Sequence, residues 1–451
     1  MMDRDVVEPK VKKLPGSNAK RWVSYHMKYA AVSTYNPYFV WNRKAPAIGP
    51  FCTDVDENII MDFCSHVGSS PLGYNNPALT AMARELAGID PDRYAGADFI
   101  SGYGHKPDLS LPTPSHLHHK LKEITKQFRF DQAFFSNSGA EAVENAIKLC
   151  YQSRKNFGYG ICFDGAFHGR TLGALSLNRS KWQHRMFYPQ IPKVISFPYP
   201  IVKDKNNCNW YCISRKGGKT NVLAETLDKD CGVIRPEEVS YIIIEPVQGE
   251  GGYRFPNPDA FREVYDVAQQ NDIPIISDEV QAGMGRTGKW WACENFGVKP
   301  DMIASGKALK VGATVGKKEL FPKIEGRISS TWGEGNAIAT AVGYKTIEII
   351  QKERLLDNAA KMGKQLRNRL EDIQQKYPKH IVDVRGLGLL DAFEISDQKK
   401  RKKILYECLK RGLLLAPCGY KTIRVLPPLD VKERELELFT TILADVMKKL
   451  K

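Results

Sequence analysis

Residues 273–280, IPIISDEV, form a short apolar run that ends on two adjacent carboxylates. Apolar residues occupy consecutive positions in this run, as in a strand that is covered on both faces. Comparable runs lie on either side of it, YIIIE at 241–245 and MIAS at 302–305. A helical pattern over residues 259–271 separates YIIIE from IPIISDEV. Alternating buried strands and helices predict an α/β fold with a mostly parallel sheet covered by helices.

The same alternation continues toward the N-terminus. Three more strands are predicted there, AFFS at 133–136, ICFD at 161–164 and VISF at 194–197. The first is followed by a helical pattern with Ala140, Val143, Ile147 and Cys150 on one face. The predicted sheet therefore has at least six strands.

The remaining sequence predicts a second, smaller domain. After about residue 335 the pattern changes to long amphipathic helices with short strands, which indicates a C-terminal small domain over 335–451. The large domain is expected over 101–334, and residues 1–100 are expected to pack with the small domain. Residues 203–235 are polar and irregular, and we interpret them as an inserted loop.

Composition indicates an ordinary folded protein. The 451 residues exceed what one hydrophobic core normally covers, and 42% of them are hydrophobic. No stretch approaches the roughly 18 apolar residues that a membrane helix requires. The N-terminus, MMDRDVVEPKVKKLPG, lacks the apolar core of a secretory signal and is not acid-poor like a transit peptide. We therefore expect a cytoplasmic protein with no membrane partner.

The net charge of +15 raises the alternative of nucleic-acid binding. The densest basic run, residues 399–403, opens a helical pattern and has no aromatic residues between its charges, so it predicts one solvated helix end. The ten cysteines are scattered, and the pair Cys208 and Cys212 lacks the two-residue spacing of a zinc knuckle. The histidines of HLHH at 116–119 follow Pro114 and Ser115, and we interpret them as part of a solvated helix end. No nucleic acid and no metal are expected.

Residues just after the strands deserve the closest inspection, because ligands of open parallel sheets bind beyond the carboxyl ends of the strands. Asn137, Ser138, Gly139 and Ala140 follow the first strand and open a helix. Free backbone amides and the helix dipole there would suit a phosphate group. The same residues are equally typical of a routine turn and helix cap.

Asp278 and Glu279 end what should be a buried strand, where an unpaired charge is costly. A cationic heteroaromatic nitrogen would be a suitable partner for one of them. A helix cap, or a salt bridge to nearby Arg286, is the structural alternative.

Lys307 follows the next strand, 29 residues after Asp278. Burial there would lower the pKa of its amine and allow a Schiff base, although a single lysine is usually only a solvated charge. Phe167 and Arg170 follow another strand and offer a ring to stack and a guanidinium for a carboxylate, although Phe167 alone could simply be core. A phosphate seat, a carboxylate and a lysine on successive strand ends indicate pyridoxal phosphate.

Six strings carry a resemblance to a known family, namely FFSNSGAEAVENAIK (134–148), FDGAFHGRTLG (163–173), IIEPVQGEGG (243–252), IISDEVQAGMGRTG (275–288), KPDMIASGK (299–307) and STWGEGN (330–336). Together they resemble the class III (subgroup II) aminotransferases, which depend on pyridoxal phosphate and have fold type I. The resemblance covers nearly the whole chain. It implies a large, mostly parallel-sheet domain and a smaller α+β domain formed by the two chain ends.

The resemblance also implies a role for each matching residue. Lys307, six residues after Asp301, lies where the family has its Schiff-base lysine, and Asp278 where a carboxylate pairs with the pyridine nitrogen. Lys307 would act as general base and acid and move a proton between substrate and cofactor carbons. The other cofactor contacts implied are Ser138, Gly139, Ala140, Phe167, His168, Val280, Gln281 and Thr331.

Thr331 matches a family residue that reaches the phosphate in the neighbouring subunit. A homodimer with shared active sites is therefore implied. The family string STWGGN is lengthened here by Glu334, which leaves the role of Asn336 open.

Within the family, the strings LLDNAAKMGKQL (355–366), VDVRGLG (382–388) and CGYKTIRVLPPL (418–429) resemble 4-aminobutyrate aminotransferases most, and STWG with FDGAFHGRT resembles lysine 6-aminotransferases. Both place arginines at Arg170 and Arg424 and an acid at Glu250. The resemblance implies transfer of an amino group from an ω-amino acid, best 4-aminobutyrate, to 2-oxoglutarate by a ping-pong mechanism. Lysine, ornithine and acetylornithine remain alternative donors.

Two other functions stay open. Racemases and aminomutases of the same class share the lysine, the carboxylate and the phosphate seat, although two arginines suited to a dicarboxylate favour transamination. A basic binding protein with a retired site is the other alternative, and it is disfavoured because every expected catalytic position is filled.

Overall fold

The computed structural model describes residues 2–33, 37–89, 102, 104–107, 111–201, 209–328, 332–333 and 336–450. The chain divides into two compact units. One comprises Met1–Thr80 with Asp357–Lys451, and the other comprises Ala81–Leu356. The two ends of the chain thus share the smaller unit, as expected for its fold class.

The larger unit is built on a seven-stranded sheet with the order β4-β12-β11-β10-β9-β5-β6. The strands are β4 (Gln132–Ser136), β5 (Tyr159–Phe163), β6 (Val194–Phe197), β9 (Val239–Ile244), β10 (Ile275–Asp278), β11 (Met302–Ser305) and β12 (Gly312–Gly316). Pairs β5–β6, β5–β9, β9–β10 and β10–β11 are parallel, whereas β12 is antiparallel to both its neighbours. The predicted α/β class with a mostly parallel sheet is confirmed.

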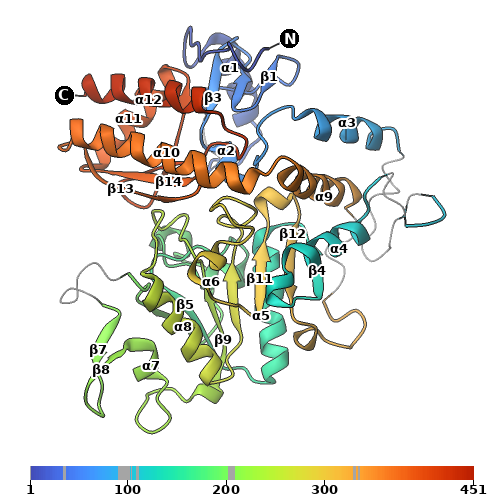
Figure 1. Ribbon diagram of the computed structural model, residues 1–451, viewed down its shortest axis with the longest axis vertical. Coiled ribbons are helices and arrows are strands. Elements are labelled where there is room, and N and C mark those ends of the chain that lie inside the picture. The colour runs from blue at the N-terminus through green and yellow to red at the C-terminus, as the bar shows by residue number, and fades with distance from the viewer. Residues whose placement is uncertain are drawn as a thin grey trace. The chain divides into compact units, whose positions relative to one another are not determined.

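Helices cover both faces of this sheet (Figure 1). They are α4 (Pro114–Ile124), α5 (Gly139–Arg154), α6 (Leu172–Ser176), α8 (Pro258–Gln270) and α9 (Ala337–Lys352). Ile242 and Ile244 of β9 belong to a core with residues of α4 and α8, while Tyr241 and Ile243 belong to a second core with residues of α5. The consecutive apolar residues of the strand are therefore explained by burial on both faces.

The insertion differs from expectation. Instead of an irregular loop, its described part contains the hairpin β7 (Tyr211–Ile213) and β8 (Lys219–Asn221), followed by α7 (Val222–Thr226). Trp210 is fully buried and its Nε1 donates to Glu263 of α8 at 2.8 Å. The polar sequence of the insertion did not predict these elements, because a single buried side chain, Trp210, and its hydrogen bond to Glu263 anchor them.

The smaller unit contains two sheets and several helices. Its sheets have the orders β1-β2-β3-β15 and β13-β14-β17-β16. The strands are β1 (Ala47–Ile48), β2 (Phe51–Thr53), β3 (Ile59–Asp62), β13 (Ile381–Leu387), β14 (Leu390–Ile395), β15 (Leu413–Leu414), β16 (Ala416–Cys418) and β17 (Thr422–Val425). The helices are α1 (Ser17–Met27), α2 (Ser65–Gly68), α11 (Gln398–Lys410) and α12 (Glu433–Lys448), while α3 (Pro77–Leu86) and α10 (Leu355–Lys376) run across the boundary between the units.

The basic run at 399–403 does lie at a helix start, because Asp397 caps α11. It is not wholly solvated, however. Arg401 is 8% exposed and its Nη1 donates to the carbonyls of Cys418 and Gly419 at 3.0 and 3.1 Å. Arg401, inside the basic run, thus stabilises the turn between β16 and β17.

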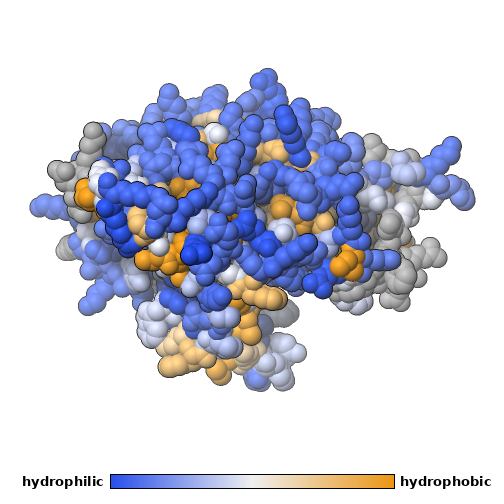
Figure 2. All heavy atoms as spheres, turned by 90° about the horizontal axis from the view of Figure 1, so that it is seen from below, coloured by the Kyte–Doolittle hydropathy of each residue, from blue (hydrophilic) through white to orange (hydrophobic). Residues whose placement is uncertain are grey.

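The face seen from below is mostly hydrophilic, with several separate groups of hydrophobic atoms (Figure 2). Such local groups are usual on folded proteins. Among the helices of the described ranges, none is long and apolar enough to cross a membrane.

Candidate active site

The start of α5 forms the predicted phosphate seat. Ser138 is the N-cap, and its Oγ accepts the N–H of Glu141 at 3.2 Å. Glu141 reaches back to accept the N–H of Asn137 at 2.6 Å. These reciprocal bonds fix the helix start and leave the first-turn amides of Gly139 and Ala140 at its open end. An anion at that end would meet two N–H groups and the positive end of the helix dipole.

Glycines bring four strand ends together around this seat. A Cβ on Gly139 would lie 2.6 Å from Cγ1 of Val280, and one on Gly306 would lie 3.1 Å from Cα of Gly139. Similarly, a Cβ on Gly169 would lie 2.6 Å from Cβ of Ala140. The segments that follow β4, β5, β10 and β11 are therefore in contact, and their closeness requires glycine at these positions.

Asp278 lies at the end of β10 and is 4% exposed. Its Oδ2 is 2.7 Å from Nδ1 of His168, and its Oδ1 accepts the N–H of Val280 at 3.0 Å. Nε2 of His168 is buried and has no hydrogen-bond partner among the described residues. The imidazole is thus a polar support for Asp278, and no ion pair with Arg286 is needed to explain the buried carboxylate.

Glu245 is a second buried carboxylate that the sequence analysis missed. It follows β9 directly and accepts the N–H groups of Phe167 at 2.9 Å and Gly249 at 3.0 Å. Burial raises its pKa to about 7, the charge of Asp278 adds to this, and His168 opposes it. Glu245 therefore ties two loops of the site together. Inspection of every residue directly after a strand would have found it.

Glu279 has different hydrogen-bond partners from its neighbour Asp278. Its Oε2 accepts the N–H of Ala292 at 2.8 Å, and its Oε1 accepts the N–H of Cys293 at 2.9 Å. Ser277 adds a hydroxyl contact at 3.3 Å. The structural alternative of a cap thus applies to Glu279, which holds the short 3-10 helix Ala292–Phe296.

Titration of Glu279 should make folding stability depend on pH. Burial raises the pKa of its carboxyl from 4.5 to about 7. Since the folded-state pKa is the higher one, the stabilisation is fully present below about 4.5 and is lost as the pH rises through about 7. We expect Glu279→Gln to reduce the loss of unfolding free energy between pH 5.5 and 8 by roughly 2 kcal/mol. Urea unfolding of both proteins at the two pH values measures this, and equal losses would contradict it.

Lys307 follows β11 after Gly306 and is half-buried. The Cα of Asp278 pairs with that of Ala304 across the parallel strands β10 and β11, so Lys307 lies three residues beyond that pair on the neighbouring strand end. Its φ of 37° is in the left-handed region, which is unusual for a lysine and typical of functional sites. The predicted carboxylate at the end of β10 and the predicted lysine just after β11 thus lie at the carboxyl ends of adjacent parallel strands.

An outer group of charged and aromatic side chains surrounds Phe167. Its ring centroid is 5.4 Å from that of His184 and 5.5 Å from Cζ of Arg170. Glu250 accepts a hydrogen bond from Nζ of Lys181 at 2.5 Å. Burial lowers the pKa of His184, and the positive charges of Arg170 and Lys181 add to the effect. The two predicted substrate residues of this unit, Arg170 and Glu250, therefore lie in one electrostatic cluster.

Lys181 and His184 were not anticipated from the sequence. They lie in a loop and a short 3-10 helix far from any strand end, so no pattern singled them out. Gln281 was anticipated, and it lies against Gly249, where a Cβ would be 2.2 Å from its Oε1. That Oε1 is buried without a partner in the described residues.

The other predicted residues fall elsewhere. Arg424 is on β17 in the smaller unit, 7% exposed, and its Cα pairs with those of Ala392 and Ala416. Thr331 and Glu334 lie outside the described residues. Asn336 accepts the N–H of Ala339 at 2.9 Å and caps α9, which gives it a structural role.

These residues fit the cofactor implied by the sequence. Two open helix amides suit a phosphate, a buried carboxylate suits a ring nitrogen, and a primary amine follows on the next strand. The buried Nε2 of His168 and Oε1 of Gln281 supply polar atoms that have no other partner in the described part of the chain. The glycines let the segments that follow the strands approach one another closely.

Comparison with known proteins gives the same family. Residues 31–447 match the family Aminotransferase class-III. The chain is 34% identical over 413 residues to an acetylornithine aminotransferase of Synechocystis sp., covering 88% of this chain and 87% of the relative. It is 31% identical to an alanine/serine racemase of Pyrococcus horikoshii, covering 97% and 93%. It is 30% identical to the mitochondrial 4-aminobutyrate aminotransferase of Mus musculus, covering 89% and 84%.

A solved structure supports the fold. The lysine aminotransferase of M. tuberculosis superposes with a TM-score of 0.79 at 24% identity, covering 96% of this chain and all of that one. At this identity the likeness establishes the fold alone.

Proposed function

Because the chain belongs to the class III aminotransferases, which depend on pyridoxal phosphate, we propose that it moves an amino group from an ω-amino acid to 2-oxoglutarate. 4-Aminobutyrate is the donor we favour. The observation that carries the proposal is the convergence of the Gly139 seat, Asp278 and Lys307 on neighbouring strand ends. Arginines at 170 and 424 add two groups suited to the two carboxylates of the acceptor.

In this proposal each residue of the larger unit has one task. Gly139 and Ala140 bind the phosphate through their amides, supported by Ser138, and Asp278 keeps the ring nitrogen protonated with His168 behind it. Phe167 and Val280 enclose the ring, and Gln281 donates to its phenolic oxygen. The bound cofactor supplies an electron sink. Lys307 holds the cofactor at rest and then, as a free amine, moves the proton from the substrate carbon.

The two substrates differ in charge, which the site must accommodate. 2-Oxoglutarate has two carboxylates, for Arg170 and Arg424, whereas 4-aminobutyrate has one, for Arg170. A guanidinium left buried without a partner would cost about 3 to 5 kcal/mol. We propose that Glu250 pairs with Arg424 while the amine reacts and moves away when the oxo acid binds. Nζ of Lys181 lies 2.5 Å from Oε1 of Glu250. Lys181 can therefore pair with the Glu250 carboxylate while the oxo acid occupies Arg424.

Replacing Glu250 by alanine should therefore separate the two half-reactions. We expect the rate with 4-aminobutyrate to fall about tenfold or more and the rate with glutamate, which brings its own second carboxylate, to fall much less. Single-turnover absorbance changes of the loaded enzyme measure each half-reaction. Equal losses with both amines would contradict the switch.

The donor is tested with a panel of 4-aminobutyrate, lysine, ornithine, N-acetylornithine and β-alanine, with 2-oxoglutarate as acceptor. We expect the largest kcat/KM with 4-aminobutyrate and stoichiometric formation of glutamate. The relatives named above include acetylornithine and 4-aminobutyrate aminotransferases, so the panel decides between real alternatives.

Racemisation is the second candidate function. The observation that favours it is the similarity over 97% of the chain to an alanine/serine racemase. Inversion of an α-amino acid without glutamate formation would establish it in place of transamination.

The assembly and location belong to the same proposal. We propose a homodimer in which Thr331 of one subunit reaches the phosphate bound by the other, and a cytoplasmic location. The match of Thr331 to the family string supports the homodimer.

A further inference from the structure

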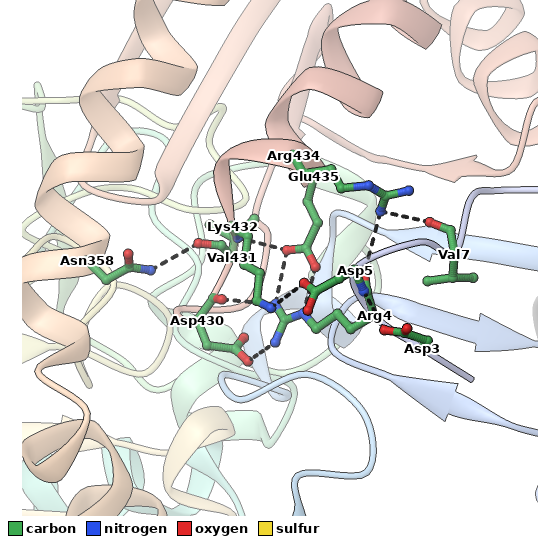
Figure 3. Close-up of polar contacts among 10 residues, drawn as sticks. All are labelled: Asp3, Arg4, Asp5, Val7, Asn358, Asp430, Val431, Lys432, Arg434 and Glu435. Carbon is green, nitrogen blue, oxygen red and sulfur yellow. Dashed lines mark hydrogen bonds and ion pairs between the residues drawn. The ribbon is translucent and has the colours of Figure 1, made fainter. Parts of the chain in front are cut away.

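Arg4 joins the N-terminal segment to the start of α12 (Figure 3). Its Nε and Nη2 donate to the two carboxylate oxygens of Glu435 at 2.6 and 3.0 Å. Its Nη1 donates to Oδ2 of Asp430 at 2.5 Å, and Nη2 also donates to the carbonyl of Asp430 at 2.9 Å. The side chains of Arg4 and Glu435 are 13% and 1% exposed. One guanidinium thus binds three acceptor groups in a largely desolvated position, where bidentate geometry is strongest.

The guanidinium also packs on the backbone of Gly49. A Cβ there would lie 2.5 Å from Nε of Arg4, so glycine is required, and its φ of 53° is also left-handed. Gly49 exchanges backbone hydrogen bonds with Tyr74, at 2.7 and 3.2 Å. Arg4 therefore touches two separate segments, residues 430–435 and the Gly49–Tyr74 pair.

Residues 430–435 follow Arg424 closely along the chain. Asp430 is six residues beyond it, and the chain between them is tied at both ends. The N–H of Leu429 donates to the carbonyl of Pro71 at 2.7 Å, and that of Leu426 donates to Phe63 at 2.6 Å. The loop from 426 to 430, which directly follows the strand of Arg424, is thus held by residues 63 and 71 and, at Asp430, by Arg4.

The second segment leads to a strained turn beside Arg424. Ser65, His66 and Val67 have φ values of 44°, 48° and 58°, a left-handed run that is costly for residues with a Cβ and worst for a β-branched one. The hydroxyl of Ser65 donates to the carbonyl of Leu426 at 2.7 Å. Such strain persists only where surrounding contacts hold it.

Asp62 supplies most of those contacts. Its carboxylate accepts the N–H groups of Cys64 at 2.8 Å and Ser65 at 2.9 Å, and the hydroxyl of Tyr74 at 2.8 Å. Burial raises the pKa of the Cys64 thiol, Asp62 adds to this, and the charge of Arg424 opposes it. The bond from Ser65 to Leu426, two residues after Arg424, places the turn next to the end of that strand. Tyr74, which pairs with Gly49, is therefore part of the same support.

We propose that Arg4 is a positioning residue for the substrate carboxylate that Arg424 receives. By holding Asp430 and the Gly49–Tyr74 pair at once, it fixes both the loop that follows Arg424 and the turn beside it. The inference rests on the proposed function, since it takes Arg424 to bind the α-carboxylate of the oxo acid. Arg4 itself touches neither substrate nor cofactor.

The test is Arg4→Met, which keeps an unbranched apolar stem and removes the guanidinium with its charge and donors. We expect KM for 2-oxoglutarate to rise about tenfold, because small displacements of a binding group are costly. KM for 4-aminobutyrate, whose carboxylate goes to Arg170, should change less than about twofold, and kcat less than about threefold. Binding of glutarate, an unreactive dicarboxylate, should weaken about tenfold in isothermal titration calorimetry.

Lys12→Met is the matched control. It removes an ion pair of the same N-terminal segment, Lys12–Glu57 at 2.8 Å, whose side chains are 59% and 78% exposed. Exposed pairs contribute little, so both KM values should stay unchanged. Asp430→Asn is the second variant if Arg4→Met does not fold, and it should raise KM for 2-oxoglutarate in the same direction by a smaller factor.

Two results would overturn the inference. One is an unchanged KM for 2-oxoglutarate and an unchanged affinity for glutarate in a folded variant. The other is an equal rise of KM for both substrates, which a general loss of structure would cause. Failure of the wild-type protein to transaminate is a different result, because it refutes the proposed function itself.

Discussion

Replacing Lys307 by alanine is expected to lower kcat for transamination by roughly 10⁴-fold or more, because one amine both holds the cofactor and moves the proton. The variant should also lose the covalent bond to pyridoxal phosphate. Borohydride reduction of the wild-type protein followed by peptide mass spectrometry should place the label on residue 307, and the variant should carry none.

Lys310 provides the control for this experiment. It lies three residues away just after the same 3-10 turn, and desolvation lowers the pKa of its amine although its side chain is exposed, so it is a suitable competing lysine. Lys310→Ala should keep the label and most of the activity. A label on residue 310 in the wild-type protein would move the proposed role from Lys307 to its neighbour.

Replacing Asp278 by asparagine should have the next largest effect. Asparagine keeps the shape and can still accept the N–H of Val280, but it removes the negative charge opposite the ring nitrogen and beside His168. We expect kcat to fall about a thousandfold, which corresponds to about 4 kcal/mol of transition-state stabilisation. Steady-state kinetics with saturating cofactor measure it, so that weaker cofactor binding does not contribute.

Glu279→Gln separates charge loss at this site from charge loss in general. Glu279 is the adjacent carboxylate, but it bonds the amides of Ala292 and Cys293 and has no proposed role in the chemistry. Its variant should retain nearly full kcat at pH 7. If both variants lost activity equally, the position of Asp278 would have no special role.

Most strands of the sheet were predictable because burial of a strand produces a local run of apolar residues in the sequence. β6 and β11 coincide with the predicted VISF and MIAS runs. Every residue of β11 is buried, whereas β6, at the edge of the sheet, has Phe197 buried and Ser196 exposed. β12 was missed because GATVG has two glycines and little side chain to show a pattern. It is a strand through its antiparallel pairing with β4 and β11, which is a long-range property.

The site was predictable where function follows strand ends, as for Asp278 and Lys307. It was not predictable where a residue acts through distant partners. His168 supports Asp278 from 110 positions away, and Lys181 pairs with Glu250 from 69 positions away. No periodicity links such pairs, so only the folded chain shows them.

A crystal structure of the protein loaded with pyridoxal phosphate tests the central claim most directly. We expect continuous electron density from Nζ of Lys307 to the cofactor and a carboxylate oxygen of Asp278 within about 2.6 to 3.2 Å of the ring nitrogen. Density joined to another lysine, or a ring nitrogen that faces no carboxylate, would contradict it.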